Sequence, residues 1–482
     1  MNDIFDAIGR RFSMASEGAE DQGPVAEIEV DEAGAPLTAE DTVEGEVIEA
    51  SEHAEEAEET AAEAETVEHT AEALESFLLA SVEDRRNGNY WSAQTARSVE
   101  RGFQAVIQAT GGNPNFKVRQ LAGENFSDRR DAQSSMISFE NAVTDMLKTL
   151  WQKLKDMVKK VIRHVRQFFI KHFSAVGMLK KRAEAMKKKA QTQEKAPGKG
   201  KVTVSGWSAL QIKNAMPEGK EIAFGIGVLA TFAEELSAKT LTSYSDALEA
   251  VADIIDSDKV SDADAVKLVL HAVAEQQRQV SGNWTLWPDT PPKHAGIDRL
   301  SETGQATKEL PGGVVAVGVV TDRGLDAYWQ SMAPNGSINL TAADYATVLK
   351  DIRFVFVQAR DKSKDLDTGK EHKRLSAGEV LTICSKILEF CDSALRHKNS
   401  FERYEKQTDK FLAKMDKIAN DTRGHDDDDP KTATIRRNLA SGCAASLRNM
   451  TLWQQSVERR GLSISRAALD YCNASLNTSN TN

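Results

Sequence analysis

Between residues 139 and 173, apolar side chains recur every three to four residues without a break. This spacing places them on one face of an α-helix, whereas a half-buried strand would alternate at every second residue. If the whole segment is helical, it is about 52 Å long at the standard rise of about 1.5 Å per residue. The fold is therefore expected to be mostly α, with one long amphipathic helix. The stripe consists of Phe139, Val143, Met146, Leu147, Leu150, Leu154, Met157, Val158, Val161, Val165, Phe168 and Phe169.

The same part of the chain is strongly basic, because residues 145–190 contain 14 basic and 3 acidic side chains. Three interpretations are open. The stripe packs into the protein's own core while the lysines face water, or the helix lies on a membrane surface, or it contacts nucleic-acid phosphates without reading sequence. The charge excess is larger than a structural helix needs, which favours an anionic partner without identifying it. The candidate anion-binding residues are Lys148, Lys153, Lys155, Lys159, Lys160, Arg163, Arg166, Lys171, Lys180, Lys181, Arg182, Lys187, Lys188 and Lys189.

The N-terminal segment has the opposite charge. Residues 1–75 contain 24 of the chain's 73 acidic side chains, two arginines and no lysine, for a net charge of about −22, and the remaining residues carry about +10. After a short amphipathic helix expected at 3–14, residues 15–73 have no aromatic side chain and are expected to be disordered, at most transiently helical around 52–73. A long acidic leader on a basic body suggests a mask, a solubilising segment or a removable pro-segment.

The change of composition coincides with a candidate cleavage site. A glutamate two positions after a small residue is a simple recognition element for a protease, and a disordered leader would be accessible to one. A cut at this place would separate the acidic leader from the basic body, a large electrostatic change. The same small-x-Glu pattern recurs, for example at 61–63 and 456–458, so its position is what singles this site out. The predicted site is Ala73, Leu74, Glu75 and Ser76.

The rest of the chain divides into three predicted regions. A basic helical region at 76–195 is followed by a small mixed α/β region at 202–360, in which Val314–Val320 and Phe354–Val357 are expected to be strands. Residues 376–476 show repeated helical patterns with polar breaks, which is typical of an antiparallel helical bundle. The four cysteines lie in the last hundred residues without zinc-ligand spacing and are expected to be buried free thiols.

No catalytic or cofactor signature accompanies these features. The sequence has no Gly-Lys-Ser/Thr phosphate loop and no His-Glu-x-x-His, and Asp426–Asp429 lacks the spacing of a calcium loop. The chain is therefore expected not to be an enzyme and to bind no metal or cofactor, although an enzyme built on 202–360 stays open as an alternative. The N-terminus lacks the features of a secretory signal and no apolar run reaches about 18 residues, which indicates synthesis as a soluble cytoplasmic product.

The overall layout resembles the internal head proteins of large tailed bacteriophages. The resemblance lies in the leader 1–75, in its candidate cleavage site, and in the lysine- and aromatic-rich helix that begins Ser138-Phe139-Glu140. It covers about the first 190 residues, and 202–482 adds no motif. It implies a structural virion protein inside the capsid, synthesised in the bacterial host cytoplasm, whose propeptide the prohead maturation protease removes. It also implies two kinds of partner, which are other phage head proteins and packaged double-stranded DNA that is bound non-specifically. Ejection together with that DNA is a further implication.

Two further functions remain compatible with the residues. A membrane-active delivery protein would place 139–173 on an anionic bilayer surface during ejection. An assembly scaffold or adaptor would keep its acidic leader in the finished particle.

Overall fold

The computed structural model describes ten stretches of the chain, which fall into two compact units. Unit 1 comprises Met1–Pro36, Thr60–Lys159 and Met415–Ser441, and unit 2 comprises Leu37–Glu59, Lys160–Lys414 and Gly442–Asn482. Most of the described residues are helical, so the mostly α fold is confirmed. The described stretches are 39–109, 129–192, 200–204, 206–234, 253, 305–319, 353–359, 371–396, 398–420 and 430–477.

The acidic leader is more ordered than its composition suggested. Helix α2 (Ala39–Arg86) runs through the last part of the leader and past the predicted cleavage site without interruption. The expectation of disorder over 15–73 therefore extends too far, because 39–73 are helical; 15–38 and the helix expected at 3–14 lie outside the described residues. A row of small side chains spaced three to four residues apart explains the difference, since alanine is the best helix former and its size permits close packing. The buried alanines are Ala50, Ala54, Ala57, Ala61 and Ala64.

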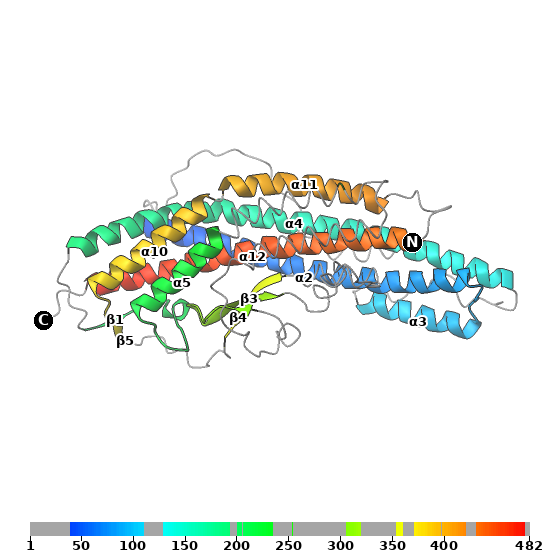
Figure 1. Ribbon diagram of the computed structural model, residues 1–482, viewed down its shortest axis with the longest axis horizontal. Helices are drawn as coiled ribbons and strands as arrows, with labels where there is room; N and C mark the ends of the chain where they lie inside the picture. Colours follow the sequence, from blue (N-terminus) through cyan, green and yellow to red (C-terminus); the bar gives the residue numbers. More distant parts are fainter. Residues whose placement is uncertain are drawn as a thin grey trace, which may run out of the picture. The chain divides into compact units, whose positions relative to one another are not determined.

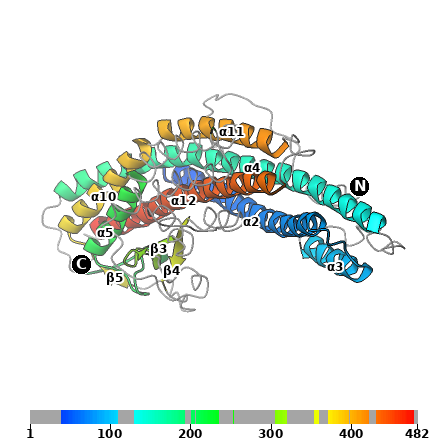
Figure 2. The same ribbon diagram turned by 45° about the vertical axis from the view of Figure 1, so that its right-hand side comes forward.

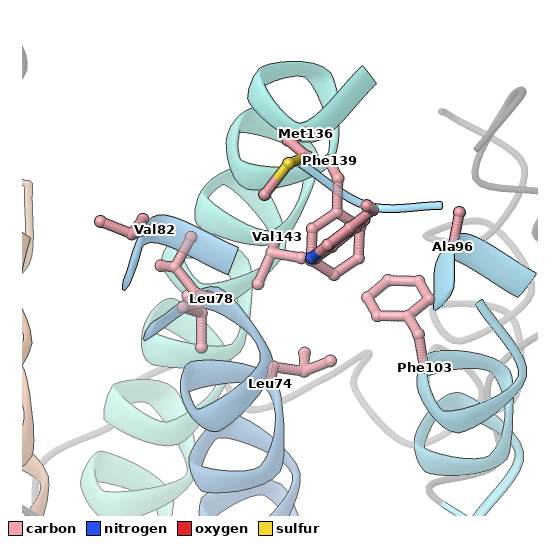
Figure 3. Packing of buried hydrophobic residues seen from close by; sticks show 10 residues of the cluster. Leu74, Leu78, Val82, Ala96, Phe103, Met136, Phe139 and Val143 are labelled. Carbon is pink, nitrogen blue, oxygen red and sulfur yellow. The ribbon is translucent and has the colours of Figure 1, made fainter. Parts of the chain in front are cut away.

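Unit 1 is built from the second part of α2, from α3 (Ala93–Ala109) and from the first part of α4 (Arg129–Thr192). These helices enclose an apolar cluster in which Phe139 of α4 is fully buried between two aromatic rings of the α2–α3 segment (Figure 3). Ring centroids lie 5.3 Å apart for Trp91 and Phe139 and 5.8 Å apart for Phe103 and Phe139, both edge to face. Such pairs contribute about 0.5–1.5 kcal/mol beyond burial. The apolar stripe of the sequence is therefore a core-facing stripe.

Helix α4 is longer than the predicted 139–173, because polar residues extend it to Arg129 and Thr192. Its second part belongs to unit 2, where it is accompanied by the first part of α2, by α10 (Ala377–Arg396), and by most of α11 (Lys398–Asn420) and of α12 (Pro430–Asn477) (Figures 1 and 2). Within the predicted bundle at 376–476, separate helical patterns at 431–458 and 463–476 indicate two helices with a break around residue 461. Helix α12 instead continues through Gly461, against which the Phe390 ring of α10 packs.

Short helix α5 (Gly219–Phe232) packs along α10 in unit 2 (Figures 1 and 2). A capping box starts α5, since Glu218 and Glu221 bond each other's backbone N–H groups. Ser376 and Glu379 make the same reciprocal arrangement at the start of α10. The two N-termini are thus fixed by side chains that the sequence supplies locally. A single 3-10 turn (Trp207–Ala209) precedes α5.

Two small antiparallel sheets complete the described part of unit 2. Strands β1 (Lys201–Thr203) and β5 (Glu371–Lys373) pair with each other, and β2 (Gln305–Ala306), β3 (Val314–Val319) and β4 (Arg353–Gln358) follow in spatial order β2-β3-β4. The two strands predicted in the mixed region are confirmed. Phe356 of β4 stacks on Trp453 of α12, with ring centroids 4.6 Å apart, which seats the larger sheet on that helix. The mixed region also has a helical sequence pattern at 262–280, which lies outside the described residues.

Candidate basic surface and leader contacts

The fourteen candidate anion-binding residues all lie on α4, and burial separates them into different groups. Lys155 is buried and Lys153 is half-buried in unit 1. Burial lowers the pKa of Lys153, and the nearby carboxylate of Glu63 on α2 opposes that shift. These two lysines are therefore part of the packed interior of unit 1 and do not form part of an exposed basic surface.

A second group holds α4 to its neighbours in unit 2. Lys180 donates a hydrogen bond to Asp392 of α10, which raises the pKa of the lysine. Lys189 donates to Asn477 near the end of α12, while Lys148 in unit 1 lies 3.8 Å from Asp145 on its own helix. The interhelical ion pairs are Arg166–Glu405 (3.2 Å), Lys180–Asp392 (2.7 Å) and Arg182–Asp470 (2.7 Å).

A third group is exposed, and no carboxylate of the described residues pairs with its members. Lys187 is half-buried and stands beside this group. Exposed cations in a row along one helix attract a polyanion at long range without reading its sequence. The exposed residues are Lys159, Lys160, Arg163, Lys181 and Lys188.

Carboxylates of the leader approach basic side chains of the body within unit 2. Glu49 of α2 lies 2.8 Å from Nζ of Lys171 on α4. Glu55 and Glu58, also on α2, lie 2.8 Å and 3.7 Å from the guanidinium of Arg459 on α12. Arg459 was not among the predicted residues, because nothing in its local sequence marks it as facing the leader. The opposite charges of the leader and the body thus meet in defined ion pairs.

Two histidines and one glutamate come together at the α2–α4 contact of unit 2. His53 and Glu56 stand three residues apart on α2, and His164 comes from α4. Their ligand atoms all lie within 4.8 Å of one another, a grouping that could hold a metal ion. No metal site was expected from the sequence. The His-x-x-Glu spacing on a helix could have flagged two of these residues, but nothing in the sequence points to the third.

The predicted cleavage site lies inside α2, in unit 1. Leu74 is fully buried in the apolar cluster, and Glu75 is only 7% exposed (Figure 3). The hydroxyl of Ser76 donates a hydrogen bond to the carbonyl of Ala73, as it does within a regular helix. A protease needs an extended and accessible segment, so the site can be cut only when this part of α2 is unfolded.

The aromatic residues that suggested a membrane surface belong to the core. Phe168 and Phe169 are fully buried, and Trp151 is buried as well. The Phe169 ring packs against Phe401 of α11 at 4.5 Å between centroids. No described helix is long and apolar enough to cross a bilayer. Contact with a membrane through this face would require α4 to leave its neighbours.

A family model of phiKZ-like phage internal head proteins matches residues 26–474. No curated protein and no solved structure matches the chain.

Proposed function

The chain belongs to the phiKZ-like phage internal head proteins, and from that premise we propose a maturation cycle in which its acidic leader first covers and then exposes a basic surface. A member of this family is a structural protein inside the phage capsid, in the company of other head components. In the proposed cycle, the prohead maturation protease cuts after Glu75. The body that remains associates non-specifically with packaged DNA and can leave the head with it.

The observation that supports this proposal is the set of contacts between leader carboxylates and basic side chains of the body. Glu49 pairs with Lys171 on α4, and Glu55 pairs with Arg459 on α12. DNA phosphates would compete for the same cations. A leader held on the body therefore disfavours premature binding of nucleic acid.

Each contact alone is weak, because exposed ion pairs contribute about 0–1 kcal/mol. The masking effect would come from the sum of these pairs and from the field of a leader that carries about −22 charges. Physiological salt screens charges beyond about 8 Å, so the carboxylates that touch the body matter most. Removal of the leader changes both contributions in one step.

The helical cleavage site sets the timing of the cut. Leu74 is part of the apolar cluster of unit 1, so a fully packed unit 1 resists a protease at Glu75. Cleavage would proceed through chains in which α2 is locally open, or before α2 has packed. Processing would then be faster on newly made protein than on protein that has completed its folding.

The test is the N-terminus of the protein in purified particles. We expect N-terminal sequencing and intact mass to give a chain that begins at Ser76. A matched precursor with Glu75→Gln should keep its leader, whereas Glu83→Gln, at another small-x-Glu position of the same helix, should be processed normally. A mature chain that begins at Met1 would contradict the proposal and would favour a scaffold or adaptor that keeps its leader.

We propose a structural role for the body, in keeping with the family to which the chain belongs.

Ejection from the head is tested separately. Infected cells should contain the processed chain shortly after DNA entry when new protein synthesis is blocked. Retention of the chain in the empty particle would contradict ejection and would leave the proposed processing and DNA association unaffected.

A further inference from the structure

The cluster of His53, Glu56 and His164 brings three metal-ligating groups to one point on two helices of unit 2. Oε2 of Glu56 lies 3.1 Å from Nδ1 of His53 and 2.8 Å from Nδ1 of His164. His53 makes a hydrogen bond to this oxygen. Nδ1 of His164 is buried, and the polar atom that faces it is this same carboxylate oxygen. One oxygen of Glu56 is thus shared between two imidazole rings that come from different helices.

The separations are close to those of ligands around a small cation. Zn²⁺ binds imidazole nitrogen and carboxylate oxygen at about 2.0–2.2 Å, so neighbouring ligands of a tetrahedral site are roughly 3.3 Å apart. Glu56 already stands near this distance from each histidine, and a modest rotation of the rings would bring His53 and His164 together. Two imidazoles and a carboxylate suit a first-row transition ion, whereas Ca²⁺ and Mg²⁺ prefer sites made of oxygen alone.

The charge around the cluster comes from its own carboxylate and from one lysine. Glu56 stands within 3.1 Å of a ring nitrogen of each histidine and supplies the negative charge that a cation needs. The opposing group is Lys160 on α4, whose positive charge acts on His164 and would weaken the affinity. It is exposed, and solvent screens much of its effect.

We propose that His53, Glu56 and His164 bind a divalent transition-metal ion of the Zn²⁺ type, which fastens the leader part of α2 to α4. Because the ligands come from two helices, the ion links α2 directly to α4. This link strengthens the attachment that the ion pairs of the leader already provide, and it does not weaken with salt as they do. If the leader is removed as proposed above, two of the three ligands leave with it and the ion is released; that consequence alone rests on the proposed function.

The chain offers a matched control on the same helix. His69 and Glu72 repeat the His-x-x-Glu spacing of α2, with 3.3 Å between Nδ1 and Oε2. The described residues bring no third histidine, cysteine or carboxylate into a comparable group with them. His69→Ala therefore removes an equivalent surface histidine without touching the proposed site.

The experiment is a titration of the full-length precursor, freed of metal with a chelator, with Zn²⁺ followed by calorimetry and with Co²⁺ followed by visible absorption. We expect binding of one equivalent and a cobalt spectrum of low coordination number. His164→Ala should weaken the affinity by more than about 100-fold, since loss of even an outer-shell partner typically costs roughly 10–100-fold. His69→Ala should leave it unchanged, and Mg²⁺ should not compete.

Circular dichroism without metal checks that His164→Ala is folded, and Glu56→Gln offers a milder second variant, which should also lose tight binding. Equal affinity in His164→Ala and His69→Ala, or no saturable binding by the precursor, would overturn the proposal. The titration uses uncleaved protein, so its outcome is independent of the N-terminal sequencing that tests the removal of the leader.

Discussion

Glu140 shows how one residue can join two helices of unit 1. It lies on α4 and is nearly buried, and its carboxylate accepts hydrogen bonds from Ser81 at 3.0 Å and from Arg85 at 3.1 Å, both on α2. The guanidinium of Arg85 also approaches it to 2.9 Å. A charge-assisted bidentate contact of this kind is among the stronger polar interactions in proteins. It also explains why a glutamate interrupts the apolar stripe beside Phe139.

We expect Glu140→Ala to destabilise unit 1 by about 1–3 kcal/mol, because Ser81 and Arg85 would lose their acceptor in a mostly buried place. Hydrogen exchange of 76–109 measures this, since exchange through opening of unit 1 should be about 5- to 150-fold faster. Asp145→Ala is the control, as Asp145 is exposed on the same helix and should change stability by less than about 0.5 kcal/mol. Equal exchange in both variants would show that the Glu140 contacts do not stabilise the unit.

At the scale of the element, the packing of α12 depends on a residue without a side chain. A Cβ added at Gly461 would meet the Phe390 ring of α10 at 2.2 Å, which no small adjustment relieves. Gly177 is the opposite case, because it lies in the interior of α4 and a Cβ there would meet nothing within 4 Å. Two glycines in long helices therefore have opposite structural meaning.

Gly461→Ala should destabilise the protein by about 1–3 kcal/mol through overpacking, despite the better helix propensity of alanine. Gly177→Ala should stabilise it by about 0.5–1 kcal/mol, because alanine loses less backbone entropy than glycine. Thermal unfolding of the full chain, followed by helical circular dichroism, compares the two. A stabilising Gly461→Ala would mean that α10 and α12 are less closely packed than described.

The elements that sequence could predict are those with a strong local signal. The 139–173 stripe correctly gave a helix, although the sequence left open what its apolar face contacts, and the β-branched run at Val314–Val320 correctly gave a strand, which the structure ends at Val319. The leader was expected to be at most transiently helical around 52–73, and its stable helix was not foreseen because its packing face is made of alanines such as Ala54 and Ala57, which count little as apolar residues but pack closely. Contacts between distant segments, such as His53 with His164, have no local signal. They could be found only once the helices were placed.

At the scale of the whole molecule, charge separation along the sequence leads to a prediction for DNA binding. In the precursor, five exposed cations of α4 are accessible, and loss of the leader would add Lys171 and Arg459. Each phosphate contact contributes about −0.9 to the slope of log K against log salt concentration. The slope is expected to steepen from about −4.5 to about −6.3 when the leader is cut off, and the affinity at low salt is expected to rise.

Binding of a random-sequence duplex to the precursor and to the processed chain from particles, at several salt concentrations, measures this change. Lys181→Ala and Lys188→Ala should each reduce the slope by about 1 in the processed chain. Lys220→Ala is the control, because Lys220 lies on α5 and pairs with Glu218. An identical slope before and after processing would show that the leader does not mask the basic surface.

The continuity of α2 across Glu75 has a consequence for the direction of maturation. Hydrolysis there would create two helix termini where the precursor has none, and about four carbonyl and four N–H groups would lose their intrahelical partners. The new amino group at Ser76 would place a positive charge at the positive end of the helix dipole, which is unfavourable. The short remnant 76–86 would then persist only through its contacts with Phe139 and its neighbours, since isolated helices of that length are marginal in water. The cut peptide bond would not form again, so maturation of each molecule would be irreversible.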